Sequence, residues 1–188
     1  NLYDEFEPGD PRREATISKP SDSEVEANTD LTYLGSPYNN NKTSFCENGI
    51  FVALDHATRS PMNYRLIRLS DVMLMYAEAA LESGKDIAVA KTMLNKVRER
   101  VGMPAFPGYR GYSDNKDLRK AIRHERRVEL AMEGHRWFDL CRWGIAYEVM
   151  DKDNGSYGKN ESAEARAEMA SFVKGKHELF PIPAEEIN

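Results

Sequence analysis

The sequence contains little cysteine, no long apolar run and no excess of positive charge. Its two cysteines, Cys46 and Cys141, are too few for a disulfide framework, and whether they pair is left open. No run of about 18 apolar residues occurs, so no membrane-spanning segment is predicted. The net charge is −5, with 26 lysines and arginines against 31 aspartates and glutamates. This balance argues against nucleic acid as a partner, because a nucleic-acid-binding protein needs a basic face.

An initial methionine and a signal sequence are also missing from the start of the sequence, which begins at Asn1. We interpret the chain as an excised or processed fragment, so the signals that would fix its localisation are expected outside it. The 188 residues are 40% hydrophobic and 30% charged, which is the balance of a globular domain large enough to bury a core.

Two regions of different character follow one another, residues 1–63 and residues 64–188. The first is loop-rich, with turn-forming clusters such as GDPRR and GSPYNNNKTS, and short strands are predicted at Glu14–Ser18 and Ile50–Leu54. The second carries apolar residues at helical spacing. We therefore predict a mainly α fold with a helical hairpin, additional helices and long irregular loops, in which residues 64–188 form one structural unit.

The helical hairpin is predicted from YRLIRLSDVMLMYAEAALESGKD and from IAVAKTMLNKVRERVGMP, which follows directly. In the first helix Leu66, Leu69 and Tyr76 recur at helical spacing, and other apolar residues widen the stripe until most sides are apolar. Such a helix is expected to be central and packed by several neighbours. Asp86 is expected to cap the second helix and Gly102 to end it. Only a few residues separate the two helices, so they should lie antiparallel, like a single tetratricopeptide unit.

The segment HERRVELAMEGHRWFDLCRWG is densely charged and also holds both tryptophans. It is compatible with an active site, a nucleic-acid-binding helix or a buried ionic network. On a third helix, from about Asp117 to Glu133, Glu125 and Glu129 fall on the apolar side, where two carboxylates need cations from other elements. We therefore favour a structural ionic network, with the predicted members Arg68, Asp71, Glu78, Glu125, Arg126, Glu129, Arg136, Asp139 and Arg142.

Catalysis by these charged residues is not predicted. A glycosidase needs two carboxyl groups with different pKa values, whereas the surrounding arginines are expected to hold Glu125 and Glu129 ionised. HERRV lacks the second histidine of an HExxH zinc site. DKDNGSYGKNES fails the spacing of an EF-hand, although weak cation binding by the Asp151–Asn160 loop stays open. No enzyme activity, cofactor or metal site is therefore predicted.

Aromatic and amide side chains gather in the N-terminal loops, where we place the candidate ligand-binding residues Tyr33, Tyr38, Asn40 and Phe45. Aromatic rings suit the apolar face of a sugar, and amides suit its rim of hydroxyl groups. The alternative interpretation is that these aromatic residues only anchor the loop to the helices.

Four motifs in order, YRLIRLSDVMLMYAEAAL, LNKVRERVGMP, ERRVELAMEGHRWFDLCRWG and KHELFPIPAEEIN, resemble the C-terminal half of the SusD/RagB family. The resemblance covers residues 60–188, and DEFEPGDPRREATI resembles the segment ahead of the variable loops of that family. It implies an α-helical fold with tetratricopeptide-like hairpins, in which the charged segment is a structural landmark. The N-terminal half of the family fold, with further hairpins and a lipidated cysteine, is expected to lie outside this sequence.

The resemblance also implies a function. Members of the family are cell-surface lipoproteins of the outer membrane in Bacteroidota, where they cap a TonB-dependent transporter and deliver glycans, or sometimes peptides, to it. We therefore expect a non-catalytic protein that captures oligosaccharides for such a transporter and reaches the membrane only through a lipid anchor. The alternatives are a helical protein–protein scaffold of the transporter complex without its own glycan site, a peptide-binding member and, last, a glycoside hydrolase.

Overall fold

A computed structural model describes the chain over residues 2–19, 38–42, 46–47, 50–51, 65–107, 117–151, 155–157, 166–167 and 171–186. The described chain is mainly helical, which confirms the predicted fold class. It forms two compact units. The larger unit combines Leu2–Ser18 with Asn40–Met132, so it includes residues on both sides of the predicted boundary at residue 63, and the smaller unit contains Lys19–Asn39 and Glu133–Asn188.

The larger unit begins with two short helices, α1 (Leu2–Glu5) and α2 (Arg12–Thr16), and a short strand, β1 (Ile17–Ser18). The predicted strand at Glu14–Ser18 is therefore wrong for its first three residues. The cause is the turn at Asp10, whose Oδ1 accepts a hydrogen bond from the Arg12 backbone N–H at 2.9 Å and so starts a helical turn.

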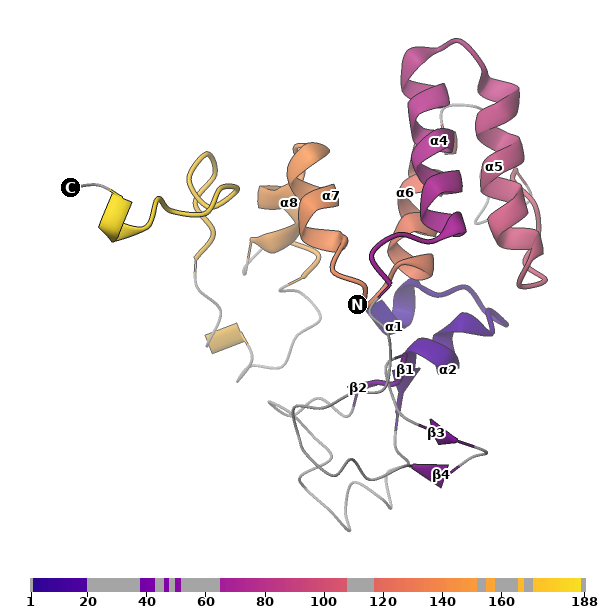
Figure 1. Ribbon diagram of the computed structural model, residues 1–188, viewed down its shortest axis with the longest axis horizontal. Helices are drawn as coiled ribbons and strands as arrows, with labels where there is room; N and C mark the ends of the chain where they lie inside the picture. The colour runs from indigo at the N-terminus through magenta and orange to yellow at the C-terminus, as the bar shows by residue number, and fades with distance from the viewer. Residues whose placement is uncertain are drawn as a thin grey trace. The chain divides into compact units, whose positions relative to one another are not determined.

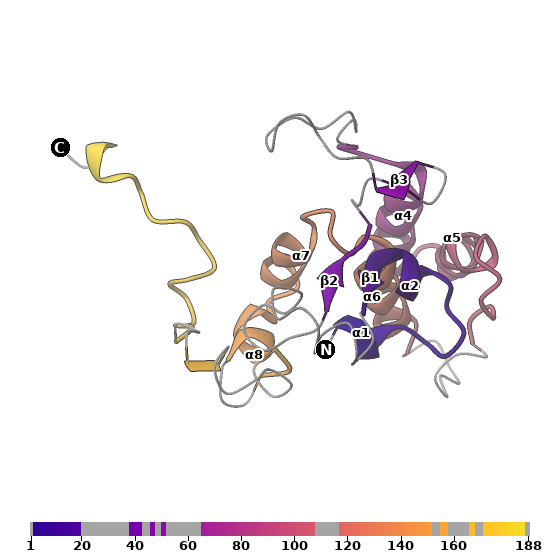
Figure 2. The ribbon, with the colours of Figure 1, turned by 90° about the horizontal axis from the view of Figure 1, so that it is seen from below.

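Three further short strands follow: β2 (Asn39–Asn40), β3 (Cys46–Glu47) and β4 (Ile50–Phe51). Figure 2 shows β1 and β2 side by side, and these two strands form one sheet while β3 and β4 form another. β3 and β4 are antiparallel, with Cys46 opposite Phe51. β4 covers the start of the strand predicted at Ile50–Leu54, and the remainder of that prediction lies outside the described residues.

The centre of this unit is the hairpin of α4 (Leu69–Ser83) and α5 (Ile87–Glu99), which lie antiparallel beside each other (Figure 1). Gly84 ends α4 with a φ of 67°, a left-handed conformation that a residue with a Cβ adopts only at a cost. Asp86 caps α5, because its Oδ1 accepts the Val89 N–H at 2.9 Å. The hairpin that the sequence predicted, with its capping residue, is confirmed.

The core lies where this hairpin meets α6 (Leu118–Glu129). Small residues on α4 allow the helices to approach closely, and larger side chains from α5 and α6 fill the remaining space. The buried members of the core are Leu74, Ala77, Ala80, Ala90, Leu94, Val97, Phe106, Leu118, Ala121 and Ile122. A helical hairpin cannot bury its apolar face alone, so α6 completes the packing of the hairpin.

One side of α4 differs from the prediction of a helix packed all round. Leu66 and Leu69 are 76% and 69% exposed, and Tyr76 is 53% exposed. Leu74 and Ala77 instead form the buried side. The prediction of a helix packed on most sides is therefore wrong: α5 and α6 pack against α4, but part of its apolar surface stays exposed.

The smaller unit contains α7 (Arg136–Arg142), α8 (Ala146–Met150) and the 3₁₀ turn Ala184–Glu186. Phe172 packs between the rings of Trp137 and His177, with centroid distances of 5.9 and 5.6 Å. Cys141 is a half-buried free thiol. Its Sγ donates to the Glu178 carbonyl at 3.6 Å, which attaches the C-terminal segment to α7.

Residues 180–183 form neither helix nor strand, and the 3₁₀ turn Ala184–Glu186 follows them. Pro181 and Pro183 disfavour a helix around Ile182. No helix in the part of the chain that the structure describes is long and apolar enough to cross a membrane.

Candidate functional site

The buried side of α6 carries charged side chains among its apolar ones. Glu125 and Glu129 are 0% and 2% exposed, and His124 and Arg126 on the same helix are also buried. A buried carboxylate is stable as an ion only where cations and hydrogen bonds replace its water. We name the two glutamates and their partners the Glu125–Glu129 cluster; its members are Glu7, Asp10, Arg12, Arg68, Arg98, Arg100, Glu125 and Glu129.

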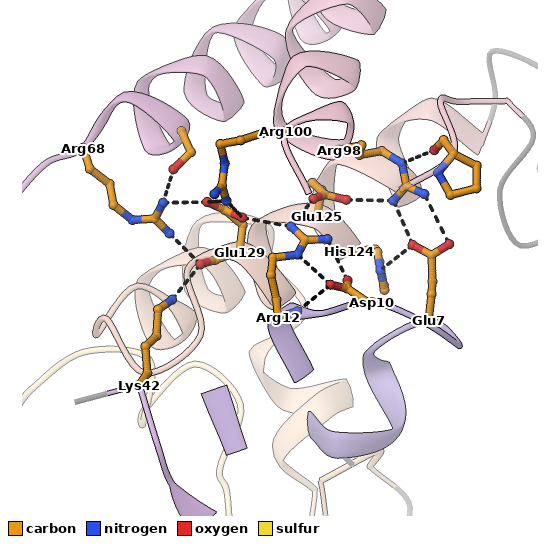
Figure 3. Close-up of polar contacts among 12 residues, drawn as sticks. Glu7, Asp10, Arg12, Lys42, Arg68, Arg98, Arg100, His124, Glu125 and Glu129 are labelled. Carbon is orange, nitrogen blue, oxygen red and sulfur yellow. Dashed lines mark hydrogen bonds and ion pairs between the residues drawn. The ribbon is translucent and has the colours of Figure 1, made fainter. Parts of the chain in front are cut away.

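Glu125 is held from two sides (Figure 3). Arg12 of α2 donates to its Oε1 at 2.5 Å, and Arg98 of α5 donates to its Oε2 at 2.8 Å. Arg98 is fully buried and also donates to Glu7 at 2.8 and 3.2 Å and to the Pro104 carbonyl at 2.7 Å. Glu125 thus joins α2, α5 and α6 through paired, charge-assisted bonds.

The Glu129 carboxylate accepts hydrogen bonds from three arginines. Arg12 donates at 2.9 Å, Arg68 at 2.5 Å, and Arg100 at 2.9 and 3.0 Å. Arg68 immediately precedes α4, and it also donates to the main-chain carbonyl of Glu129 at 2.5 Å. The residues that meet at this carboxylate therefore come from α2, from the start of α4 and from the end of α5 (Figure 3).

The pKa of Glu129 reflects a balance in which burial opposes ionisation and the hydrogen bonds and charges of Arg68 and Arg12 favour it. The arginines prevail, and the pKa falls from 4.5 to about 2. Burial similarly lowers the pKa of Arg12, but bonds to Asp10 and Glu125 outweigh it and raise that pKa above its ordinary value. Glu129 is therefore an anion at any physiological pH and has no proton to donate, which makes it unsuitable as a general acid.

The other predicted members of the ionic network are distributed over both units. Arg126 donates to Asp71 of α4 at 3.1 Å, and both side chains are buried. Glu78 contributes charge at the exposed Glu82–Arg119 pair on the surface of the larger unit.

In the smaller unit, Asp139 accepts from Arg142 within α7, at 3.0 Å from Nε and 2.8 Å from Nη2. Arg136 is the first residue of α7.

The sequence reasoning missed five members of the cluster: Glu7, Asp10, Arg12, Arg98 and Arg100. A signal for Arg98 existed, because it lies four residues after the buried Leu94, on the core side of α5. Arg12 is 113 residues from Glu125 in the chain, and no spacing rule reaches so far. Only the resemblance of the segment around GDPRR to the family indicated that the N-terminal residues take part in the fold.

Two of the four candidate ligand-binding residues lie in the described chain. Tyr38 is 40% exposed, and the Lys19 ammonium lies 5.8 Å from the centre of its ring. Asn40 is exposed, and its Oδ1 accepts the Lys42 N–H at 3.0 Å. Tyr33 and Phe45 lie outside the described residues.

The cation-binding prediction at Asp151–Asn160 also falls largely outside the described chain. Among the residues that the structure does describe, no three acidic, histidine or cysteine side chains are grouped to hold a metal ion.

Comparison with known proteins places this arrangement in a family. The model of the SusD family matches residues 1–188, and the chain belongs to that family, as its motifs predicted. It is 36% identical over 98 residues to SusD-like protein P38 of Formosa agariphila, an alignment that covers 50% of this chain and 19% of that protein. It is also 35% identical over 126 residues to SusD-like protein P25 of the same organism, covering 66% of this chain and 22% of the relative.

A solved structure is also similar, that of a SusD-like protein from Bacteroides fragilis. It is 37% identical, with a TM-score of 0.42, over 50% of this chain and 18% of the other. The chain thus spans about a fifth of the length of the proteins it resembles.

Proposed function

We propose that this chain is part of a non-catalytic outer-membrane lipoprotein that captures oligosaccharides at the cell surface and delivers them to a partner TonB-dependent transporter. The observation that carries the proposal is the match of the SusD family model to the whole chain. Weak, exchangeable binding suits such a role, because a ligand held too tightly is not passed on.

The charge chemistry of α6 supports a role without catalysis. The two carboxylates of α6, Glu125 and Glu129, each accept hydrogen bonds from at least two arginines. Both side chains are buried. This part of the chain is therefore assigned to holding the fold, which leaves ligand binding to exposed loop residues.

We assign the glycan contacts to the N-terminal loops, with Tyr38 and Asn40 as their described members and Tyr33 and Phe45 as further candidates. An exposed ring beside a lysine offers a face for C–H stacking, and a neighbouring amide offers hydrogen bonds to hydroxyl groups. One such aromatic contact contributes about 0.5–1.5 kcal/mol. Tyr38→Ala should therefore weaken binding about two- to twelvefold.

Affinity gel electrophoresis of the chain against a panel of soluble polysaccharides tests this assignment. Tyr76→Ala is the matched control, because Tyr76 is also an exposed tyrosine but lies on α4. Retardation that falls in Tyr38→Ala and persists in Tyr76→Ala supports the loop site. Equal retardation of both variants refutes it, and release of free sugar during the incubation would show that the protein is an enzyme.

A second function, a protein–protein scaffold of the transporter complex, is favoured by one observation. Leu69, Val72 and Tyr76 lie along one side of α4 and are exposed, and an apolar surface of this kind suits contact with another protein. The scaffold predicts co-purification with the transporter that falls in Tyr76→Ala and no affinity for any polysaccharide. The same two variants thus distinguish the two functions.

A further inference from the structure

The side chain of Lys42 closes the end of α6. Its Nζ donates to the main-chain carbonyls of Glu129 at 2.7 Å and of Ala131 at 3.0 Å (Figure 3 draws the first). The last carbonyl groups of a helix have no partner within the helix, and the helix dipole gives them a partial negative charge. A half-buried ammonium at this place satisfies both the geometry and the charge.

The residue just before Lys42 is attached at a different place. The Asn41 backbone N–H donates to the Thr16 carbonyl at 2.9 Å, and its side-chain Nδ2 donates to the Glu14 carbonyl at 2.8 Å. Glu14 and Thr16 belong to α2, whose Arg12 is bound to Glu125 and Glu129. Both attachments of this segment therefore lead to the same helix, α6, by separate routes.

The attached segment carries the candidate ligand residues. The Asn40 Oδ1 accepts the Lys42 backbone N–H at 3.0 Å, so the position of residue 42 orients the amide of residue 40. Strand β2, which contains Asn40, pairs with β1 directly after α2. A site that is oriented before the ligand arrives binds more tightly, because less ordering remains to be done on binding.

We propose that Lys42 is a positioning residue of the glycan site: its ammonium, fixed at the carbonyl end of α6, holds residues 40–42 in the conformation that binds sugar. This proposal rests on the proposed function, since it assumes that Asn40 contacts the glycan. Lys42 itself need not touch the ligand. Lys42 instead raises the fraction of molecules in which the segment already has the binding conformation.

The size of the effect follows from that fraction. The apparent dissociation constant equals the intrinsic constant divided by the populated fraction of the binding conformation. If loss of the ammonium lowers this fraction to about one tenth, affinity falls about tenfold. Lys42→Met removes the charge and its hydrogen bonds but keeps an unbranched side chain, and Lys42→Arg keeps a cation with donors. Lys120→Met is the control, because Lys120 is an exposed lysine on α6 itself.

Two measurements on the 188-residue chain test the proposal. The first is amide hydrogen exchange at Asn41 and Lys42 without any glycan, and the second is retardation by the polysaccharide that binds the parent chain. We expect Lys42→Met to exchange faster at both amides and to bind about tenfold more weakly. Lys42→Arg should recover most of both properties, and Lys120→Met should match the parent chain.

Failure of this proposal and failure of the proposed function give different results. Faster exchange with unchanged affinity would show that the segment is anchored but does not position the ligand, which overturns the role of Lys42 while glycan binding stands. Unchanged exchange would overturn the anchoring itself. If the parent chain binds no polysaccharide in the panel, the proposed function fails, and the positioning role fails with it.

Discussion

Replacing Glu129 by alanine is the sharpest test of the Glu125–Glu129 cluster. The carboxylate is 2% exposed and accepts hydrogen bonds from Arg12, Arg68 and Arg100. Removing one partner of a buried ion pair costs about 3–5 kcal/mol, because the remaining charge stays buried without its counter-ion. The side chains of Arg12 and Arg68 are 9% and 22% exposed. Arg12 keeps Asp10 and Glu125 as partners, so most of this cost falls on Arg68. Arg100 is 57% exposed and is rehydrated easily.

The matched control is Glu82→Ala. Glu82 forms the same kind of two-bonded pair with Arg119, at 2.6 and 2.7 Å, but the two side chains are 45% and 53% exposed. An exposed pair contributes about 0–1 kcal/mol. Both variants remove a glutamate that is bonded to arginine, but Glu129 is buried among three arginines whereas Glu82 is exposed and pairs with Arg119.

Urea denaturation followed by circular dichroism measures both free energies of unfolding. We expect Glu129→Ala to be destabilised by about 3–5 kcal/mol, or about 6–20 °C in melting temperature for a chain of this size. Glu82→Ala should remain within about 1 kcal/mol of the parent chain. A difference between the two variants smaller than about 1 kcal/mol would refute the reasoning, since burial would then have no energetic consequence at this site.

A pH series tests the ionisation of Glu129, and a substitution at Asp86 tests the cap of α5. The pKa of Glu129 is about 2 in the folded chain against 4.5 when unperturbed, so its contribution is complete above pH 4.5 and is lost as the pH falls toward 2. Urea midpoints measured between pH 6 and pH 2 should show this loss of about 3 kcal/mol, and Glu129→Gln should lack it. Asp86→Ala removes the bond to the Val89 N–H and should cost about 1 kcal/mol by the same assay. Asp117→Ala should cost less, because Asp117 makes no side-chain capping bond to α6 and its pair with Lys120 is exposed.

The sequence predicted those parts of the fold whose causes are local. Asp86 and Gly84 mark the connection of the hairpin because a cap and a left-handed residue act within a few positions of themselves. The spacing of apolar residues predicted the helices for the same reason. Glu125 and Glu129 were recognised as buried because both fall on the side of α6 that carries Ile122 and Val128.

The partners of these residues were not predictable in the same way. Arg12 reaches Glu125 across 113 positions, and Arg68 reaches Glu129 across 61. Such pairs depend on how elements far apart in the chain pack together, and local patterns in a single sequence do not predict that packing. The burial of α4 was overestimated for a related reason: a helix that is apolar on most sides does not reveal how many of those sides its neighbours cover.

The arrangement of the cluster explains why one segment is both apolar and densely charged. Apolar side chains pack in many orientations at similar free energy. The apolar core of α4, α5 and α6 therefore makes the unit compact but does less to fix the angles between its helices. Arg12 and Arg98 instead donate to Glu125 with fixed directions, and each also binds a second acid, Asp10 or Glu7. The N-terminal segment packs on α6 through a small apolar cluster of Phe6, Ile17 and Val128, and these ion pairs add directional contacts to it. Asn41 and Lys42 are attached to main-chain carbonyls of α2 and of the end of α6, the two helices that the ion pairs of Arg12 join.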